Sequence, residues 1–108
     1  MISTDKPKVF TAEQIAEFEA NNKSRGKVQH VRFQSDVNPT KPAEFWVVKP
    51  NRTQLEAISD AKTASKGNDL VINCCVLAGD VDQLNDDLDM LLGLLETCSG
   101  LVDAKKKL

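Results

Sequence analysis

Hydrophobic and polar residues alternate with different periods along the chain, and each period predicts an element. Residues 1–10 are mostly polar and predict a flexible N-terminal segment before a single domain over residues 11–108. Beyond them, apolar side chains recur at helical spacing, and Thr11 is placed to accept a hydrogen bond from the amide of Gln14 as an N-cap. The pattern therefore predicts a helix over residues 12–21.

The next segments have the alternation of β-strands. Residues 27–33 place apolar and polar side chains on opposite faces, and residues 43–49 are rich in aromatic and β-branched residues. Between them, residues 35–42 contain two prolines and an asparagine, which favour a turn. The pattern predicts a two-stranded antiparallel hairpin with Phe45 and Val47 on one face and Trp46 and Val48 on the other.

Helical spacing returns after Pro50. Asn51 is placed as an N-cap, and the apolar positions continue to about Lys66, where Gly67 is expected to break the helix. Residues 69–78 then carry a broad apolar row that predicts another helix, with Gly79 as its C-terminal cap. A buried strand is the alternative for this segment, because several of its residues are β-branched.

The last part of the chain predicts a long helix. After Asp80, leucines recur every three or four residues. Asp86 and Asp87 suit the start of a helix, and three lysines at residues 105–107 suit its end. Gly93 and Gly100 would share a face and allow another backbone to approach closely, which would explain glycine at helical positions where it costs roughly 1 kcal/mol relative to alanine. The fold class expected is α+β, with an N-terminal helix, a two-stranded antiparallel β-hairpin and a C-terminal cluster of three to four helices.

Charge is distributed unevenly. The net charge is only −2, which gives no reason to expect nucleic acid as a partner. Between Asp69 and Asp103 there is no Lys or Arg, so this stretch favours a cationic protein surface. The chain also lacks an export signal and an apolar run long enough to cross a bilayer, so we expect no membrane association and a cytoplasmic location.

Candidate chemistry is sparse. His30 is the only histidine, and its position gives no sign of pairing with a cysteine or serine nucleophile. Cys74 and Cys75 are adjacent and Cys98 stands alone, which fits neither a zinc site nor a disulfide framework and favours small core side chains. We therefore expect no enzyme activity, no metal and no cofactor. A thiol-dependent redox protein using Cys74, Cys75 or Cys98 stays open as an alternative.

Surfaces are then the main candidates for function. The acidic run over residues 80–89 lacks the central glycine and final glutamate of an EF-hand loop, so helix capping and a solvated negative face explain it better. Exposed aromatic or leucine side chains beside this run would bind a partner. The predicted partner-binding surface comprises Phe45, Trp46, Asp82, Asp86, Asp89, Leu88, Leu92 and Leu95.

Residues 44–108, about sixty per cent of the chain, resemble the small tail-assembly chaperone-type proteins encoded in the tail modules of tailed bacteriophages and prophages. The resemblance lies in a hydrophobic strand that ends in Lys-Pro before a polar helix start (EFWVVKPNRTQLEAI), a segment that ends in Gly-Asp (LVINCCVLAGD), an acidic connector and a leucine-rich terminal helix that ends in lysines.

The resemblance implies a protein that holds a tail component, such as the tape measure protein, soluble until the tail tube assembles. An α-helical client would fit an apolar groove rimmed by negative charge. The host cytoplasm would be its location. A minor virion structural or connector subunit that self-assembles is the alternative within the same context.

Overall fold

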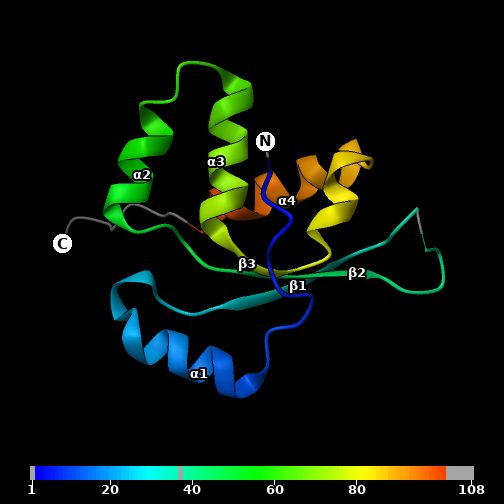
Figure 1. Ribbon diagram of the computed structural model, residues 1–108, viewed down its shortest axis with the longest axis horizontal. Helices are drawn as coiled ribbons and strands as arrows, with labels where there is room; N and C mark the ends of the chain where they lie inside the picture. Colours follow the sequence, from blue (N-terminus) through cyan, green and yellow to red (C-terminus); the bar gives the residue numbers. More distant parts are fainter. Residues whose placement is uncertain (1, 37, 102–108) are drawn as a thin grey trace.

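A three-stranded antiparallel sheet separates two groups of helices. The computed structural model describes residues 2–36 and 38–101. The first helix of the chain lies on one side of the sheet and the later helices lie on the other (Figure 1). The elements in chain order are α1 (Ala12–Asn21), the 3-10 turn η1 (Lys23–Arg25), β1 (Gln29–Phe33), β2 (Ala43–Val47), α2 (Arg52–Ser59), α3 (Ala64–Cys75), β3 (Val76–Gly79), the 3-10 turn η2 (Val81–Asn85) and α4 (Leu88–Gly100).

Local capping sets where the first two helices begin. Thr11 Oγ1 accepts from the Gln14 amide at 3.2 Å, and the Gln14 side chain accepts from the Thr11 amide at 2.9 Å. Asn51 and Gln54 repeat this reciprocal arrangement at the start of α2. Each pair satisfies two backbone amides that a helix start leaves without partners. The predicted helix over Ala12–Asn21 and the predicted cap at Asn51 are confirmed.

The sheet has one strand more than the predicted hairpin. β1 and β2 pair as expected, with Val31 opposite Phe45. β3 then pairs antiparallel to the other edge of β2, which makes β2 the central strand. The two-stranded hairpin of the sequence analysis is therefore corrected to a three-stranded sheet within the expected α+β class.

The segment predicted as helix or buried strand contains both. α3 continues to Cys75 and the chain then extends into β3, where the β-branched Val76 lies opposite Val47. Gly79 was predicted to cap the helix, but it ends the strand with a φ of +132°. A Cβ at this position would lie 2.8 Å from the Cα of Phe45, so only glycine lets the two backbones approach this closely.

Gly67 does not break a helix, contrary to the prediction. α2 ends at Ser59, and α3 begins at Ala64 and passes through Gly67. Thr63 caps α3 by accepting from the Lys66 amide at 3.1 Å. Burial of the apolar side chains later in α3 outweighs the roughly 1 kcal/mol that a helical glycine costs relative to alanine.

The predicted terminal helix begins later than its leucine pattern suggests. Residues 81–85 form a 3-10 turn, and α4 starts at Leu88 with Asp87 accepting from the Met90 amide at 3.0 Å. Asp87 as a helix start is thus confirmed. The predicted approach of another backbone is wrong: a Cβ at Gly93 would lie 3.1 Å from the Phe33 ring, and Gly100 has no such neighbour among the described residues. The predicted end of this helix at residues 105–107 lies outside the described residues.

Residues 2–8, which we expected to form a flexible segment, lie along α3 and the outer edge of β3. Ile2 is 5% exposed and belongs to the hydrophobic core. Lys6 Nζ donates to the Asn73 carbonyl at 2.9 Å. Pro7 accepts from the Gly79 amide at 2.8 Å. This segment therefore supplies a partner for a backbone amide of β3 that faces away from β2.

Candidate protein-binding surface

α4 carries two apolar rows that face in different directions. Met90, Leu94 and Cys98 are buried and turn toward the core between α3 and the sheet. Leu88 and Leu92 are 65% and 55% exposed. Because residues four apart lie on one helix face, these two leucines form a short apolar row on the outside of the helix.

Leu95 is placed between these two environments. It continues the outward row three residues after Leu92, yet it is partly buried and packs against the core cluster. Leu95 can therefore form the inner border of the outward row. We call Leu88, Leu92 and Leu95 the leucine row, and it contains all three leucines of the predicted surface.

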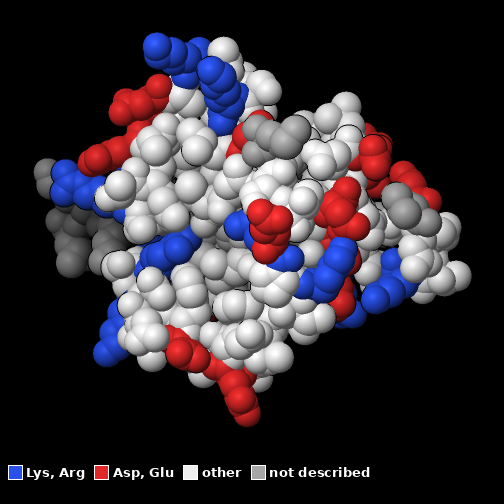
Figure 2. All heavy atoms as spheres, in the orientation of Figure 1, with Lys and Arg blue, Asp and Glu red and all other residues white. Residues whose placement is uncertain are grey.

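Acidic side chains flank the leucine row. Asp86 and Asp89 are exposed, and Glu96, also exposed, lies one turn beyond Leu92. Figure 2 shows acidic side chains on the side of the molecule where η2 and the start of α4 lie. Among the described residues, neither Asp86 nor Asp89 forms an ion pair. Their negative charge therefore faces solvent and is available to a cationic partner.

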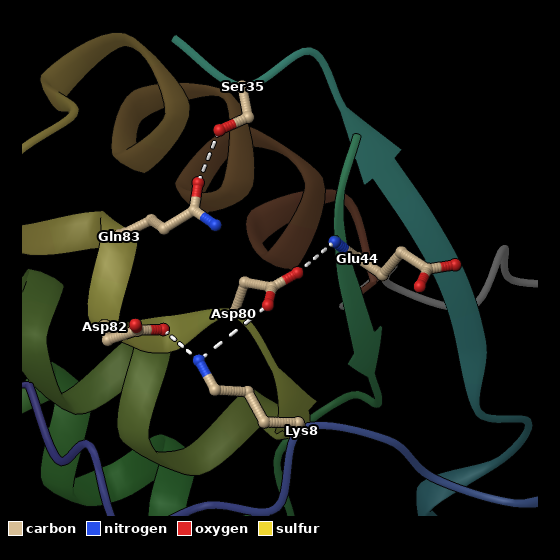
Figure 3. Close-up of polar contacts among 6 residues, drawn as sticks. All are labelled: Lys8, Ser35, Glu44, Asp80, Asp82 and Gln83. Atoms are coloured by element: carbon tan, nitrogen blue, oxygen red, sulfur yellow. Dashed lines mark hydrogen bonds and ion pairs between the residues drawn. The ribbon is translucent and has the colours of Figure 1, made fainter. Parts of the chain in front are cut away.

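Asp82 has a different role from the other predicted acidic residues. Lys8 Nζ donates a hydrogen bond to Asp82, and this bond lowers the pKa of the carboxyl group (Figure 3). Lys8 Nζ also lies 3.8 Å from Asp80 Oδ1. Asp80 Oδ2 in turn accepts from the Glu44 amide at 2.9 Å. Lys8, Asp80 and Asp82 thus tie the N-terminal segment to the start of η2 and to β2.

The two aromatic residues of the predicted surface are buried. Phe45 is 0% exposed beneath α3 and α4, and Trp46 is 7% exposed on the opposite face of the sheet. Neither side chain can act as an exposed anchor, so this part of the predicted surface is corrected. Phe45 is central to the core because β2 is the middle strand, which a two-stranded hairpin did not reveal.

His30 contacts Trp46 and Glu44. The imidazole stacks on the Trp46 ring with centroids 4.3 Å apart and an angle of 4° between the planes. Its Nε2 lies 3.1 Å from Glu44 Oε1. These contacts account for both the face and the edge of the ring, and they place His30 on the sheet as a half-exposed structural residue.

Three free thiols lie near the junction of α3 and β3. Cys75 and Cys98 are buried and line a pocket of about 200 Å³, whereas Cys74 is half-buried and does not line it. Burial raises the pKa of the Cys74 thiol. Within the part of the chain that the structure describes, no three His, Cys, Asp or Glu side chains form a group that could hold a metal ion.

Sequence reasoning missed a buried arginine. Arg25 is 8% exposed and donates through Nε to the Lys49 carbonyl at 2.9 Å and through Nη2 to the Cys74 carbonyl at 2.8 Å. Its guanidinium lies 5.4 Å from the centre of the Phe18 ring. The residue therefore joins α1, the end of β2 and the end of α3. Its local sequence gave no signal, because these partners are distant along the chain.

A second missed contact orders the loop before β2. Ser35 is 2% exposed, and its hydroxyl donates to Gln83 Oε1 at 2.6 Å (Figure 3). The same hydroxyl accepts from the Asn38 amide at 3.2 Å. The loop after β1 is thereby attached to η2, just before the leucine row begins.

Across residues 2–36 and 38–101, no helix combines the length and the apolar character that crossing a membrane requires. No family model, curated protein or solved structure matches the chain.

Proposed function

We propose that this chain is a non-catalytic binding factor that holds a helical segment of another protein against α4. The observation that carries the proposal is the exposure of Leu88 and Leu92 at 65% and 55% beside Asp86 and Asp89. Two adjacent exposed leucines on a helix whose opposite face already fills the core contribute little to folding. Burying them against a partner would remove apolar surface from water.

The chemistry of the surface favours one kind of partner. Its apolar row is as narrow as one face of a helix, and the charged residues that η2 and α4 add to its border are all acidic, because residues 67–104 contain no Lys or Arg. An amphipathic helix with leucine-like side chains on one face and Lys or Arg beside them would match both properties. A second copy of this chain would bring acidic residues against acidic residues, which makes self-assembly the less favourable use of this surface.

The resemblance of residues 44–108 to tail-assembly chaperones suggests a biological setting. In that setting the partner is a helical tail component of tape measure type, and the chain holds it soluble in the host cytoplasm during tail assembly. The resemblance implies an aggregation-prone client, and a protein that covers an apolar helical face of such a client would keep it soluble.

The experiment is co-expression of the full chain with helical segments of the tail proteins encoded beside it. We expect one segment to co-purify with the wild-type protein. The Leu88→Ser, Leu92→Ser double variant should lose at least about ten-fold in affinity, since removing two buried leucine contacts exceeds the 1.4 kcal/mol that a ten-fold change requires. Raising the salt concentration should also weaken the complex.

Val9→Ser is the matched control, because Val9 is 56% exposed but belongs to the N-terminal segment and not to α4. This variant should bind as the wild type does. If the double variant also binds normally while it remains folded, the leucine row is not the binding surface. If no neighbouring tail protein binds at all, the phage-tail setting is refuted, and a discrete oligomer in light scattering would then favour a self-assembling subunit.

A further inference from the structure

Two thiols from different helices meet at one apolar pocket. Cys75 is the last residue of α3 and Cys98 lies in the last turn of α4, and each is 1% exposed. Both line the pocket of about 200 Å³, whose remaining walls are Pro50, Leu55, Ile58, Val71 and Ser99. Leu55 is 40% exposed, so this wall of the pocket reaches the protein surface.

Both thiols line the same pocket and belong to the same buried core cluster. A hydrogen bond between the two thiols lowers the pKa of Cys75 and raises that of Cys98. Of the two sulfurs, Cys75 is therefore the one that more readily becomes a thiolate.

Two cations support a thiolate on Cys75. Burial raises the pKa of Cys75, whereas Arg25 and Lys6 lower it through their charge, and Arg25 is held in place by its bonds to the Lys49 and Cys74 carbonyls. The C-terminal end of α3 has the opposite effect, because helix carbonyls there repel an anion. The guanidinium offsets this repulsion, since it occupies the end of the helix and donates to one of those carbonyls.

We propose that Cys75 and Cys98 are a modification site at which a hydroperoxide forms a reversible disulfide that joins α3 to α4. The Cys75 thiolate attacks one peroxide oxygen, the O–O bond breaks, and the leaving oxygen takes up a proton to give water or an alcohol. Cys75 is then a sulfenic acid. The Cys98 sulfur attacks the Cys75 sulfur, the S–O bond breaks, and the Cys98 proton leaves with the hydroxide as water.

The electrons balance in this sequence. The two thiols lose two electrons together, and the peroxide gains two as its O–O bond is cleaved. A dithiol reductant restores both cysteines by thiol–disulfide exchange. Cys74 is not expected to take part, because it does not line the pocket and burial raises its pKa.

The inference is independent of the proposed binding function. The disulfide would close the segment from β3 to most of α4 into a loop and so restrict the unfolded chain. The oxidised protein should unfold at a temperature at least about 5 °C higher than the reduced protein. The leucine row lies on the cross-linked helix, so the orientation of α4 against α3 would be fixed covalently.

Cleavage at methionine tests the proposal on the full chain. Trypsin is unsuitable, because residues 67–105 form one tryptic peptide that holds all three cysteines. Met90, one of only two methionines, lies between Cys75 and Cys98, so cyanogen bromide separates them. Met90 is also 3% exposed, which protects it from oxidation to the sulfoxide that resists this cleavage.

The folded, reduced protein is treated with one to two equivalents of hydrogen peroxide, alkylated with iodoacetamide and cleaved without reductant. We expect the two fragments on either side of Met90 to remain joined, to separate on addition of dithiothreitol, and to carry the alkyl group on Cys74. The same treatment in guanidinium chloride should join Cys98 to Cys74 and Cys75 alike, because the fold no longer selects the partner.

Two variants assign the pair. Cys74→Ser should keep the cross-link and Cys75→Ser should lose it. Separated fragments from the folded wild-type protein would overturn the proposal, as would an alkyl group on Cys75 in the joined product. The position of the alkyl group is read from the wild-type protein, so the result does not depend on whether the Cys75→Ser variant folds.

Discussion

The two apolar rows of α4 lie on the same helix but in different environments. Leu94 is 0% exposed and packs among the residues of the core, whereas Leu92, two positions earlier, is 55% exposed. Both are leucines in the middle of one helix. An apolar stripe in the sequence therefore shows which side chains of a helix could be buried. The positions of α3 and the sheet decide which of them are buried.

The largest expected effect is a difference in the free energy of unfolding between a substitution in the buried row and one in the exposed row. Leu94→Ala should lower the free energy of unfolding by about 3 kcal/mol, because it removes buried methyl groups and leaves a cavity. Leu92→Ala should change it by less than about 0.5 kcal/mol, as is usual at exposed positions. Urea unfolding followed by circular dichroism measures both. Equal losses would show that the outer row is packed in solution.

A smaller effect tests whether the first turn of α4 can be destabilised while the buried row stays in place. Asp87→Ala removes the N-cap that accepts from the Met90 amide, and this should cost about 1 kcal/mol. The first turn, which contains Leu88, would fray, while Leu94 further along the helix remains buried. Asn is an equally good N-cap, so Asp87→Asn should restore most of the stability. A loss as large for Asn as for Ala would assign the effect to the charge.

The smallest effect concerns Asp82, the acidic residue of the predicted surface that accepts a hydrogen bond from Lys8. Its pKa lies below the ordinary value of 3.8, so the pair stabilises the fold above about pH 4, and this stability is lost as the pH falls through the lowered pKa. The side chain is 58% exposed, so screening by water limits the contribution to below about 0.5 kcal/mol.

Comparison of urea unfolding at pH 6 and pH 3 in the wild type and in Lys8→Gln measures this contribution. The variant should lose slightly less stability on acidification, because Asp82 then titrates near its ordinary value in both the folded and the unfolded chain. An identical pH dependence in the two proteins would show that Lys8 does not stabilise the fold through Asp82.

Features determined by near neighbours were accessible from the sequence. Thr11 and Asn51 cap helices through amides three residues ahead, as predicted, and Asp87 caps α4 where the sequence predicted an acidic helix start. Exposure of Asp86 and Asp89 also follows from their charge. These predictions succeeded because the interacting groups lie within one turn of each other.

Features determined by distant contacts were not accessible. β3 is only four residues long and follows α3 without a break, and it exists because β2 offers a free edge. That third strand makes β2 central and buries Phe45, which removed it from the predicted surface. Arg25 was missed for the same reason, since its two carbonyl partners lie 24 and 49 residues away.

The central claim is that the leucine row is a contact surface and not part of the core. Paramagnetic relaxation of leucine methyl groups by a soluble probe tests it directly, with and without the co-purified partner segment. We expect strong relaxation of Leu88 and Leu92 in the free protein, protection of both in the complex, and no change at Leu94. Protection of Leu88 and Leu92 in the free protein, or continued exposure of both in the complex, would contradict the claim.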